Sequence, residues 1–435
     1  MRDFAISDNP AVQTQLDRLG ALSLPSGRFG LDTVRALCAR LGNPQDRLPA
    51  VFHVAGTNGK GSTCAYLRAM LEAQGLAVHC ATKPHLVRYN ERIRIAGSLI
   101  ADDLLAALLS EVLDAAEGLD PSFFEVTTLA TFLAFSRIPA DACVIETGLG
   151  GRLDATNVMP TAAVCGIATL GMDHEAFLLA PEEGVPGEPL ARIAFEKASI
   201  AKPGVPLVTM AYPPIAAESV AATAAKIGAP LFMRGRDWDA RINDQILYRD
   251  DRGELPLPLP ALAGAHQAEN AALAVAMIRR QNAVSVAPAA MAHGIASARW
   301  PARLQKLAHG PLTALAGQRN VWLDGGHNPD AGAAIARHLA DQPPVHIILG
   351  MLASKDPSAL LKPLGRHALS LSIVPAPGHD AHQPEDFAPF SALPVRRCGS
   401  VPEALTGLPP EGDVLIAGSL YLAGEVLRLN REIPD

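Results

Sequence analysis

The chain has 435 residues, of which 49% are hydrophobic and 19% charged, and its formal net charge at pH 7 is −7. A globular chain of this length can bury a sizeable core and is expected to form two or three domains. The modest acidic charge, without a basic stripe or aromatic residues interleaved with basic ones, argues against nucleic acid as a partner.

The first predicted elements are helices over residues 11–22 and 31–41, where apolar residues recur at helical spacing. A short apolar run over 51–55 then predicts a strand. An amphipathic helix over 62–74 and a second strand over 76–82 follow it. The first of these strands and its helix flank the most informative stretch of the sequence.

That stretch is a glycine-rich loop in the setting of a phosphate-binding loop, between a strand and a helix. Its glycines leave backbone N–H groups open to phosphate oxygens, and the helix N-terminus adds a partial positive charge. Lys60 provides a point charge for the β- and γ-phosphates, and the Ser62 hydroxyl is a candidate Mg²⁺ ligand. The spacing is unusual because Gly61 separates Lys60 from Ser62. The loop predicts nucleotide binding without specifying a reaction.

Beyond residue 100, helices and strands alternate along the chain. Helices are predicted at 102–117, after residue 125 and at 191–200, and strands at 142–145, 162–169 and 205–210. Such alternation is typical of a mostly parallel sheet covered by helices.

The strand at 142–145 ends at Glu146 and leads into the glycine-rich run 147–157. A carboxylate at the carboxyl end of a buried parallel strand lies on the edge where open α/β sheets bind ligands. Beside a phosphate loop, such a carboxylate is the expected Mg²⁺ anchor. Arg152 and Asp154 can hold polar groups of a substrate. The pair Asp173-His174 follows the next strand in the same way, although such a pair is often structural.

Residues 229–263 differ from the rest, because prolines at every second position over 255–260 allow only an edge strand or an extended connector. Two helices, at 266–280 and 287–297, lead to a predicted domain boundary near residues 297–303. Beyond it lies a second, smaller α/β domain. Its strands are predicted at 320–323, 345–349, 369–374 and 414–417, and its helices at 329–340, 357–364, 401–407 and 420–430.

The six cysteines show no C-x-x-C pair, and most of them lie in apolar runs, which predicts reduced, buried thiols. The start of the chain lacks the apolar core of a signal peptide. No apolar run approaches the roughly 18 residues of a membrane span. We therefore expect a cytoplasmic enzyme without a membrane partner.

Four polar residues outside the first sheet are further candidate ligand contacts. Asn270 near the start of a helix could pair with an adenine edge, and Arg303 at the domain junction could reach a phosphate. Asp324 and His327 follow a strand of the second domain and are predicted to face its carboxyl edge. A structural role is an equal alternative for Asn270 and Arg303.

Taken together, these motifs resemble the folylpolyglutamate synthase and dihydrofolate synthase branch of the Mur ligase family. The match runs in order through nearly the whole chain. It includes HVAGTNGKGST (53–63), PHLVRYNERIRIAG (84–97), IETGLGGRLDATN (145–157), FEKASIAKPGVP (195–206), AHQAENAALA (265–274), PARLQ (301–305), LDGGHNP (323–329) and VLIAGSLYLAGEV (414–426).

The resemblance implies an α/β protein with two domains. Residues 1–297 would form a P-loop NTPase-like domain of the Mur ligase central type, binding ATP and a pterin, and residues 298–435 a Rossmann-like ligase domain. The implied reaction transfers the γ-phosphate of ATP to a pterin carboxylate and then lets the amine of L-glutamate displace phosphate. The acceptors would be dihydropteroate, folate polyglutamates or both, and the enzyme a monomer.

The resemblance also implies roles for individual residues. Lys60, Glu146, His174 and Lys197 would be catalytic, and magnesium, as one or two ions, would be held by Ser62, Glu146, His174 and Lys197, with potassium as a further candidate ion. Lys197 matches a lysine that is carbamylated in the family. ATP would contact Gly56, Thr57, Asn58, Gly59, Lys60, Gly61, Ser62, Asn270, Arg303, Asp324 and His327. The pterin substrate would contact Ser122, Phe124, Glu125, Arg152, Leu153, Asp154 and Ala155, with the loop at 23–29 closing over it.

The chain departs from the family pattern at three places. Lys83 stands where the family usually has a metal-binding serine, Ser199 replaces a usual glycine, and the loop between His174 and Lys197 is longer than usual. A protonated lysine cannot ligate a metal, so we hypothesise that the Lys83 ammonium replaces a cation.

Two other functions remain open at this point. A cell-wall Mur ligase shares the same core, but usually carries an N-terminal domain larger than the roughly fifty residues that precede the phosphate loop here. A nucleotide-binding regulator that has lost catalysis, with Lys83 as the lesion, is the second. Glu146, His174, Lys197 and Asp324 argue against it.

Overall fold

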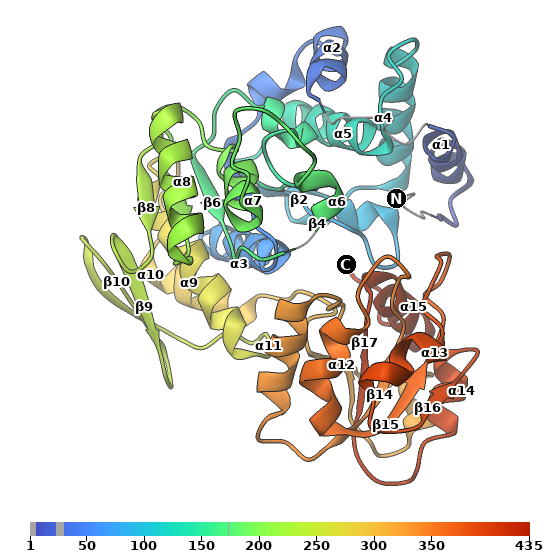
Figure 1. The fold of residues 1–435 in the computed structure, drawn as a ribbon. Coiled ribbons are helices and arrows are strands. Elements are labelled where there is room, and N and C mark those ends of the chain that lie inside the picture. Colours follow the sequence, from blue (N-terminus) through green and yellow to red (C-terminus); the bar gives the residue numbers. More distant parts are fainter. Residues whose placement is uncertain (1–5, 23–29, 173) are drawn as a thin grey trace. The chain divides into compact units, whose positions relative to one another are not determined.

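The computed structural model describes residues 6–22, 30–172 and 174–435, and its chain divides into two compact units (Figure 1). The first unit contains the described residues up to Lys83, Tyr89–Ala261 and Ala268–Ala298, and the second contains Pro84–Arg88, Leu262–Gln267 and Arg299–Asp435. The second unit therefore includes two short segments that precede the junction at Arg299.

The first unit is built on an eight-stranded sheet with the strand order β4-β3-β2-β5-β1-β6-β7-β8. Its parallel strands are β1 (Ala50–Ala55), β2 (Val78–Ala81), β5 (Ala142–Glu146), β6 (Val164–Ile167), β7 (Leu207–Thr209) and β8 (Leu231–Met233). The two remaining strands of this sheet are antiparallel: β3 (Ile93–Ile95) pairs with β2, and β4 (Ser98–Leu99) pairs with β3. Apart from β8, these parallel strands are buried along their whole length or nearly so, as expected for a sheet covered on both faces.

Helices cover this sheet, with α4 and α5 on one side and α3 on the other (Figure 1). They are α1 (Pro10–Gly20), α2 (Asp32–Arg40), α3 (Lys60–Ala73), α4 (Asp102–Ala115), α5 (Phe123–Arg137), α6 (Glu175–Leu178), α7 (Pro189–Ala198), α8 (Pro214–Ile227), α9 (Ala265–Arg280) and α10 (Pro288–Ser297). Helices α3 and α10 pack closely, since a Cβ on Gly294 would lie 2.5 Å from the backbone nitrogen of Met70.

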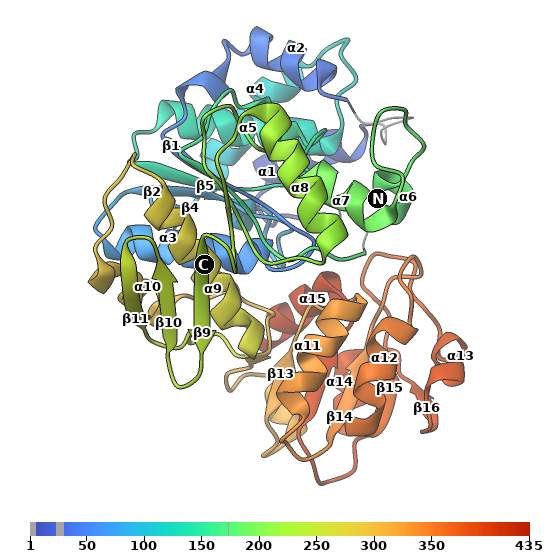
Figure 2. The same ribbon diagram turned by 60° about the vertical axis from the view of Figure 1, so that its left-hand side comes forward.

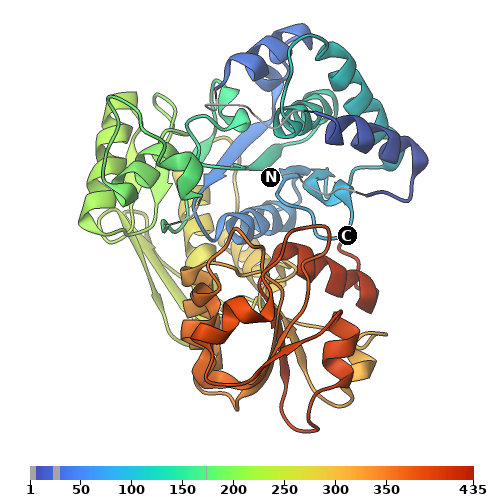
Figure 3. The ribbon, with the colours of Figure 1, turned by 45° about the vertical axis from the view of Figure 1, so that its right-hand side comes forward.

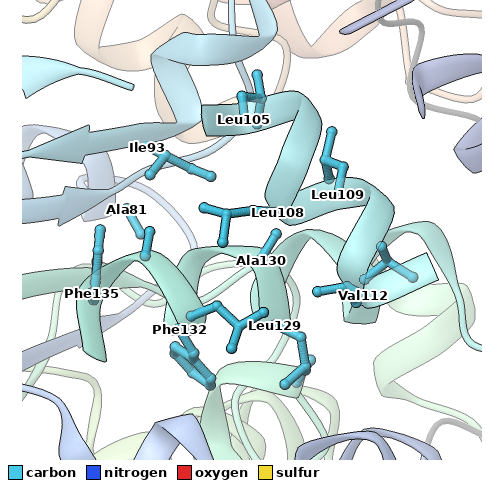
Figure 4. Packing of buried hydrophobic residues seen from close by; sticks show 14 of the residues in the cluster. Ala81, Ile93, Leu105, Leu108, Leu109, Val112, Leu129, Ala130, Phe132 and Phe135 are labelled. Carbon is cyan, nitrogen blue, oxygen red and sulfur yellow. The ribbon is translucent and has the colours of Figure 1, made fainter. Parts of the chain in front are cut away.

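One apolar core of the first unit lies where α4 and α5 pack together (Figure 4). Leu105, Leu108, Leu109 and Val112 recur at helical spacing and form one apolar stripe of α4. This stripe packs with α5, where Phe132 is among the fully buried side chains. Burial of each large apolar side chain contributes about 1.5–3 kcal/mol, so this interface holds α5 firmly in place.

A separate antiparallel sheet accounts for the unusual composition of residues 229–263. Figure 2 shows its strands side by side: β9 (Trp238–Ile242), β10 (Ile246–Asp250) and β11 (Gly253–Leu257). Pro256 lies in β11, which is an edge strand of this sheet. The prediction from the alternating prolines is thus confirmed, because proline lacks the N–H that an interior strand needs.

The second unit is a six-stranded sheet with the order β12-β13-β17-β14-β15-β16. Its strands are β12 (Gln305–Lys306), β13 (Val321–Leu323), β14 (Val345–Leu349), β15 (Ala368–Ile373), β16 (Val395–Arg397) and β17 (Val414–Ala417), all parallel except β12. Its helices are α11 (Pro329–Leu339), α12 (Ser358–Leu364), α13 (Pro384–Phe387), α14 (Val401–Thr406) and α15 (Leu420–Asn430).

Helices lie on both sides of this sheet, shown in orange and red in Figure 3. Successive residues of β17 belong to two different apolar cores: Ile416 packs with Val401 and Leu427, whereas Leu415 packs with Ile335 and Leu360. Alternation of this kind places one core on each face of the sheet. The α/β fold class, with mostly parallel sheets, is confirmed.

Sequence reasoning missed several short or amphipathic elements. Helix α8 was not predicted, and neither were the β3–β4 hairpin, the edge strand β16 or the one-turn helices α6 and α13. Short elements carry too few residues for a periodic pattern to emerge. Among the described residues, no helix is long and apolar enough to cross a membrane.

Candidate active site

The phosphate loop lies between the carboxyl end of β1 and the first turn of α3, as the sequence predicts. Gly59 occupies the N-cap position of α3 with φ +84°, a left-handed conformation that glycine adopts without strain. No side-chain hydrogen bond caps this end of α3 in the described part of the chain. The first N–H groups of α3 can therefore bind an anion. The Lys60 ammonium donates to the carbonyl oxygens of Gly56 at 2.9 Å and Thr57 at 3.2 Å.

Hydrogen bonds to the segment after β6 hold the loop in place. The Thr57 N–H donates to the Thr169 carbonyl at 2.7 Å, and the Thr57 hydroxyl donates to the Gly171 carbonyl at 2.9 Å. The Thr169 hydroxyl donates to the Asn58 carbonyl at 3.1 Å. The loop is thus fixed before any ligand arrives, which lowers the entropic cost of binding.

Asn270, on α9, lies directly against this loop. A Cβ placed on Gly59 would come 2.4 Å from the Asn270 side-chain oxygen and 3.4 Å from the Ala168 Cβ. Asn270 is buried. The structure therefore brings Asn270 to the phosphate loop, and its predicted pairing with adenine stays a prediction.

Glu146 ends β5 beside β1, and its Cα pairs with that of Val54 just before the phosphate loop. Only 4% of Glu146 is exposed. One of its carboxylate oxygens accepts the backbone N–H of Lys83 at 3.0 Å. The carboxylate and the phosphate loop therefore share the carboxyl edge of the sheet, as predicted from the sequence.

The proposed metal ligands come from four separate elements. Ser62 is buried in the first turn of α3, and Lys197 is buried near the end of α7. His174 precedes α6 with φ +53°, an uncommon backbone conformation for a side-chain-bearing residue. Asp173 and the loop at 23–29 lie outside the described residues.

The residues at this edge fit a nucleotide with a magnesium ion. Across the described residues there is no group of three or more His, Cys, Asp or Glu side chains able to hold a metal. A small number of protein ligands is typical of a Mg²⁺ site, because the ion usually binds one or two carboxylates together with phosphates and waters. The buried Thr147 hydroxyl, next to Glu146, has no hydrogen-bond partner within the described structure. An unsatisfied buried hydroxyl is costly, so a ligand at this edge would stabilise it.

The loop after Glu146 is organised by Asp154. One Asp154 carboxylate oxygen accepts the N–H groups of Gly148 at 2.8 Å and Leu149 at 2.9 Å, and the other accepts the Thr156 N–H at 3.0 Å. Asp154 and Ala155 are buried, and Leu153 is half-buried. The carboxylate predicted to hold substrate therefore also shapes the backbone of its own loop.

Arg152 belongs to an ionic network that sequence reasoning missed. Its guanidinium contacts Glu196 at 2.9 Å and also pairs with Glu182, while Arg192 pairs with Glu182 at 2.8 Å and with Glu196 at 3.1 Å. Glu182 comes from the loop whose length departs from the family pattern. Arg192 and Glu196 are buried and Arg152 and Glu182 are half-buried, so these ion pairs tie the loop at Glu182 to α7.

The N-terminus of α5 holds the other predicted substrate contacts. Ser122 and Glu125 form a capping box, in which the Ser122 hydroxyl accepts the Glu125 N–H and the Glu125 carboxylate accepts the Ser122 N–H. The Phe124 ring packs against the loop, since a Cβ on Gly148 would lie 2.5 Å from its Cζ. The Lys83 ammonium lies 4.1 Å from the centre of the same ring.

The remaining predicted contacts lie in the second unit, at the carboxyl end of β13. Asp324 follows this strand and is buried, and burial raises the pKa of its carboxyl group although Arg303 nearby lowers it. A ring nitrogen of His327 lies 3.0 Å from the Gly325 carbonyl oxygen. Asn328 caps α11. The structure thus brings Arg303, Asp324 and His327 to one edge of this sheet.

The chain is similar in sequence to enzymes of one family. No protein-family model matches the sequence. The chain is 34% identical to the folylpolyglutamate synthase of Lacticaseibacillus casei over 416 residues, covering 90% of this chain and 92% of that protein. It is 31% identical to the dihydrofolate synthase/folylpolyglutamate synthase of Bacillus subtilis, covering 91% and 94% of the two chains.

Solved structures show the same fold. Escherichia coli FolC in complex with DHPP and ADP superposes with a TM-score of 0.84 at 30% identity, covering 97% of this chain and 98% of that one. The bifunctional folylpolyglutamate synthase/dihydrofolate synthase of Yersinia pestis, complexed with AMPPNP and Mn ion, gives a TM-score of 0.83 at 27% identity, covering 98% and 99%. The chain therefore belongs to the folylpolyglutamate synthase/dihydrofolate synthase family of ATP-dependent ligases.

Proposed function

We propose that this enzyme joins L-glutamate to a pterin carboxylate at the expense of ATP, with both dihydropteroate and reduced folates as acceptors. The observation that carries the proposal is the arrangement of the phosphate loop and Glu146 at the ends of the adjacent parallel strands β1 and β5. The relatives support it, since one related structure contains DHPP and ADP, and another contains Mn, AMPPNP and L-glutamate.

The reaction proceeds in two displacements that need no protein nucleophile. A carboxylate oxygen of the acceptor attacks the γ-phosphorus of ATP, ADP leaves, and an acyl phosphate forms. The amine of L-glutamate then attacks the acyl carbon, phosphate leaves, the amine loses its proton, and an amide results. Catalysis of this kind consists mainly of positioning and charge neutralisation.

The chain's own residues serve those two purposes. The N–H groups of the phosphate loop bind the triphosphate, and the Lys60 ammonium turns from the carbonyl oxygens it now contacts toward the β- and γ-phosphates. Magnesium, held by Ser62, Glu146, His174 and Lys197, would neutralise charge on the phosphates. In this proposal the acceptor binds along the N-terminus of α5 and the loop at Arg152–Ala155.

We assign residues 1–297 to ATP and pterin binding and residues 298–435 to a ligase domain, in which Arg303 and His327 contact the nucleotide and Asp324 lies beside them. Carbamylation of Lys197 would convert a buried cation into a carboxylate-like ligand, and K⁺ is a further candidate ion. Lys197 is buried on α7, in the position that matches the carbamylated lysine of the family.

We further propose that the enzyme is a cytoplasmic monomer. All six cysteines are buried and unpaired, as the sequence predicted, and free thiols persist in reducing compartments. Burial raises the pKa of the Cys165 thiol to about 12, which keeps it unreactive. Light scattering of the purified protein tests the monomer, and a dimer mass would overturn it.

Transfer of oxygen from acceptor to phosphate tests the proposed chemistry. Dihydropteroate labelled with ¹⁸O in its carboxylate is incubated with enzyme, ATP, magnesium and L-glutamate, and the released phosphate is analysed by mass spectrometry. We expect one ¹⁸O atom per phosphate. A parallel reaction with unlabelled acceptor in ¹⁸O-water should give unlabelled phosphate. Label from water would contradict the acyl phosphate and indicate simple ATP hydrolysis.

A further inference from the structure

The residues on either side of Arg303 adopt an unusual backbone conformation. Ala302 has φ +55° and Leu304 has φ +43°, so two residues with side chains lie in the left-handed region, separated by one arginine. Non-glycine residues rarely adopt this conformation, and it persists where the surrounding structure imposes it. The turn that carries Arg303 is therefore held in a conformation its sequence does not favour.

Burial on opposite faces of the sheet fixes the two flanking side chains. Ala302 is fully buried in the core that contains Val321 and Leu427. Leu304 is 2% exposed and belongs to the core on the other face, with Ile335 and Leu349. The chain therefore crosses from one face to the other within three residues, and Arg303 lies at the crossing point.

Hydrogen bonds fix the backbone of the same turn. One Asp324 carboxylate oxygen accepts the Leu304 N–H at 2.8 Å, and the other accepts the Gly326 N–H at 2.6 Å. The Gln305 side chain accepts the Ala302 N–H at 2.9 Å, and the Gly325 N–H donates to the Ala302 carbonyl at 3.0 Å. The two Asp324 oxygens thus hold the backbone of the two segments that meet beside Arg303, one at Leu304 and the other at Gly326.

The Arg303 side chain is aligned by this frame. Its guanidinium donates to the Ala302 carbonyl at 2.8 Å. The guanidinium also lies close to the backbone of Gly325, since a Cβ placed there would lie 3.1 Å from the Arg303 Nη1 atom. A shift of the turn would move the guanidinium with it.

We propose that Asp324 is a positioning residue that holds the strained turn at Ala302–Leu304 and thereby fixes Arg303 for the nucleotide. This inference rests on the proposed function, in which Arg303 contacts ATP. In this inference the Asp324 carboxylate acts on nucleotide binding indirectly, by holding the backbone next to Arg303. Loss of the carboxylate should then matter only while Arg303 is present.

A double-mutant cycle on nucleotide affinity tests this dependence. The dissociation constant of a fluorescent ATP analogue is measured for the full-length wild type, Asp324→Asn, Arg303→Ala and the double variant. We expect Asp324→Asn to weaken binding about tenfold in the wild type, because the amide nitrogen repels one of the two N–H groups, and by less than twofold in Arg303→Ala. Equal losses in both backgrounds would show that Asp324 acts on the nucleotide independently, and would overturn the inference.

Two further variants separate positioning from general stability. Asp413, at the other end of β13, accepts the Asn320 N–H and side chain at 2.9 Å each, so Asp413→Asn is a matched loss of a structural carboxylate. It should lower the melting temperature without changing nucleotide affinity. Ala302→Gly should keep the melting temperature while weakening affinity several-fold, because glycine frees the turn. Unchanged affinity in Ala302→Gly would contradict the role of the strained turn.

The Arg303→Ala variant also distinguishes this inference from the function on which it rests. If that variant binds nucleotide as tightly as the wild type, Arg303 is not a nucleotide contact and the inference fails for that reason. The ligase reaction would then be judged separately, by acceptor-dependent phosphate release.

Discussion

Lys83 contacts Glu146 at two points. Its backbone N–H donates to a carboxylate oxygen of Glu146 at 3.0 Å, and its ammonium donates to the Glu146 carbonyl at 3.2 Å. The same ammonium lies over the Phe124 ring, and burial lowers the pKa of Lys83 to about 8. A cation is therefore built into the edge of the sheet where Glu146 is proposed to hold magnesium.

Replacing Lys83 should change how many metal ions the site takes. If the ammonium replaces a cation, Lys83→Ser should bind one more Mn²⁺ per enzyme in the presence of AMPPNP, and its activity should depend more steeply on magnesium. Counting bound Mn²⁺ by electron paramagnetic resonance measures the first effect directly. Lys226→Ser, an exposed lysine on α8, is the control for loss of charge alone. Identical metal dependence in wild type and Lys83→Ser would contradict the hypothesis that the Lys83 ammonium replaces a cation.

Gly59 should not tolerate a side chain. In Gly59→Ala the new Cβ would meet the Asn270 side-chain oxygen at 2.4 Å. We expect ATP to bind about 10- to 100-fold more weakly, which corresponds to about 1.4–2.8 kcal/mol. Isothermal titration of ATP analogue into the protein measures the loss.

Gly75→Ala is the matched control, because Gly75 has a nearly identical φ of +88° at the other end of α3 with nothing within 4 Å of its Cβ. Gly75→Ala should carry the same backbone strain as Gly59→Ala and still bind ATP as tightly as the wild type. Equal affinities for the two variants would mean that contact with Asn270 is irrelevant.

Carbamylation of Lys197 should be visible in solution. After incubation with ¹³C-bicarbonate, the wild type should show a carbamate carbon by NMR, and Lys197→Arg should lose both this signal and about 10²- to 10³-fold in kcat. Lys202 hydrogen-bonds the Asn157 carbonyl and side chain at 3.0 and 2.9 Å, so Lys202→Arg is a suitable control that should keep the signal. A signal that persists in Lys197→Arg would assign the carbamate elsewhere.

His266 should make the protein less stable in acid. The pKa of His266 is lowered to about 4, mainly by burial and to a smaller extent by the positive charges of Arg303 and Arg337. Between pH 6.5 and 4 the folded state therefore binds fewer protons than the unfolded state. The contribution of neutral His266 to the free energy of unfolding is complete above pH 6.5 and is lost as the pH falls through this window. We expect a loss of up to about 3 kcal/mol from this group.

Thermal unfolding of wild type and His266→Gln at pH 7 and pH 5 measures this contribution. The wild type should lose more stability between the two pH values than the variant does. An equal drop in both proteins would show that His266 is not responsible.

The phosphate loop and Glu146 could be predicted from sequence because each adjoins a strand, and the carboxyl ends of parallel strands share one edge. The contact between Lys83 and Glu146 could not, because it depends on β2 and β5 being neighbours, and strand order is not encoded in local periodicity. Arg152 was expected to bind substrate. Its ion pairs with Glu182 and Glu196 depend on how a long loop folds back onto α7.

The strained turn around Arg303 was equally beyond sequence reasoning. Ala302 and Leu304 are ordinary residues whose left-handed conformations are imposed by two cores and by the buried Asp324. By contrast, the edge strand that contains Pro256 could be predicted, because proline excludes an interior strand whatever surrounds it.

Acceptor-dependent phosphate release tests the central claim most directly. Purified enzyme with magnesium-ATP and L-glutamate is assayed with dihydropteroate and, separately, with tetrahydrofolate. Phosphate release with both acceptors, each dependent on glutamate, is the predicted result, and release with only one would restrict the enzyme to that half of the activity. Tight ATP binding with no release for either acceptor would contradict the account and indicate a nucleotide-binding protein without ligase activity.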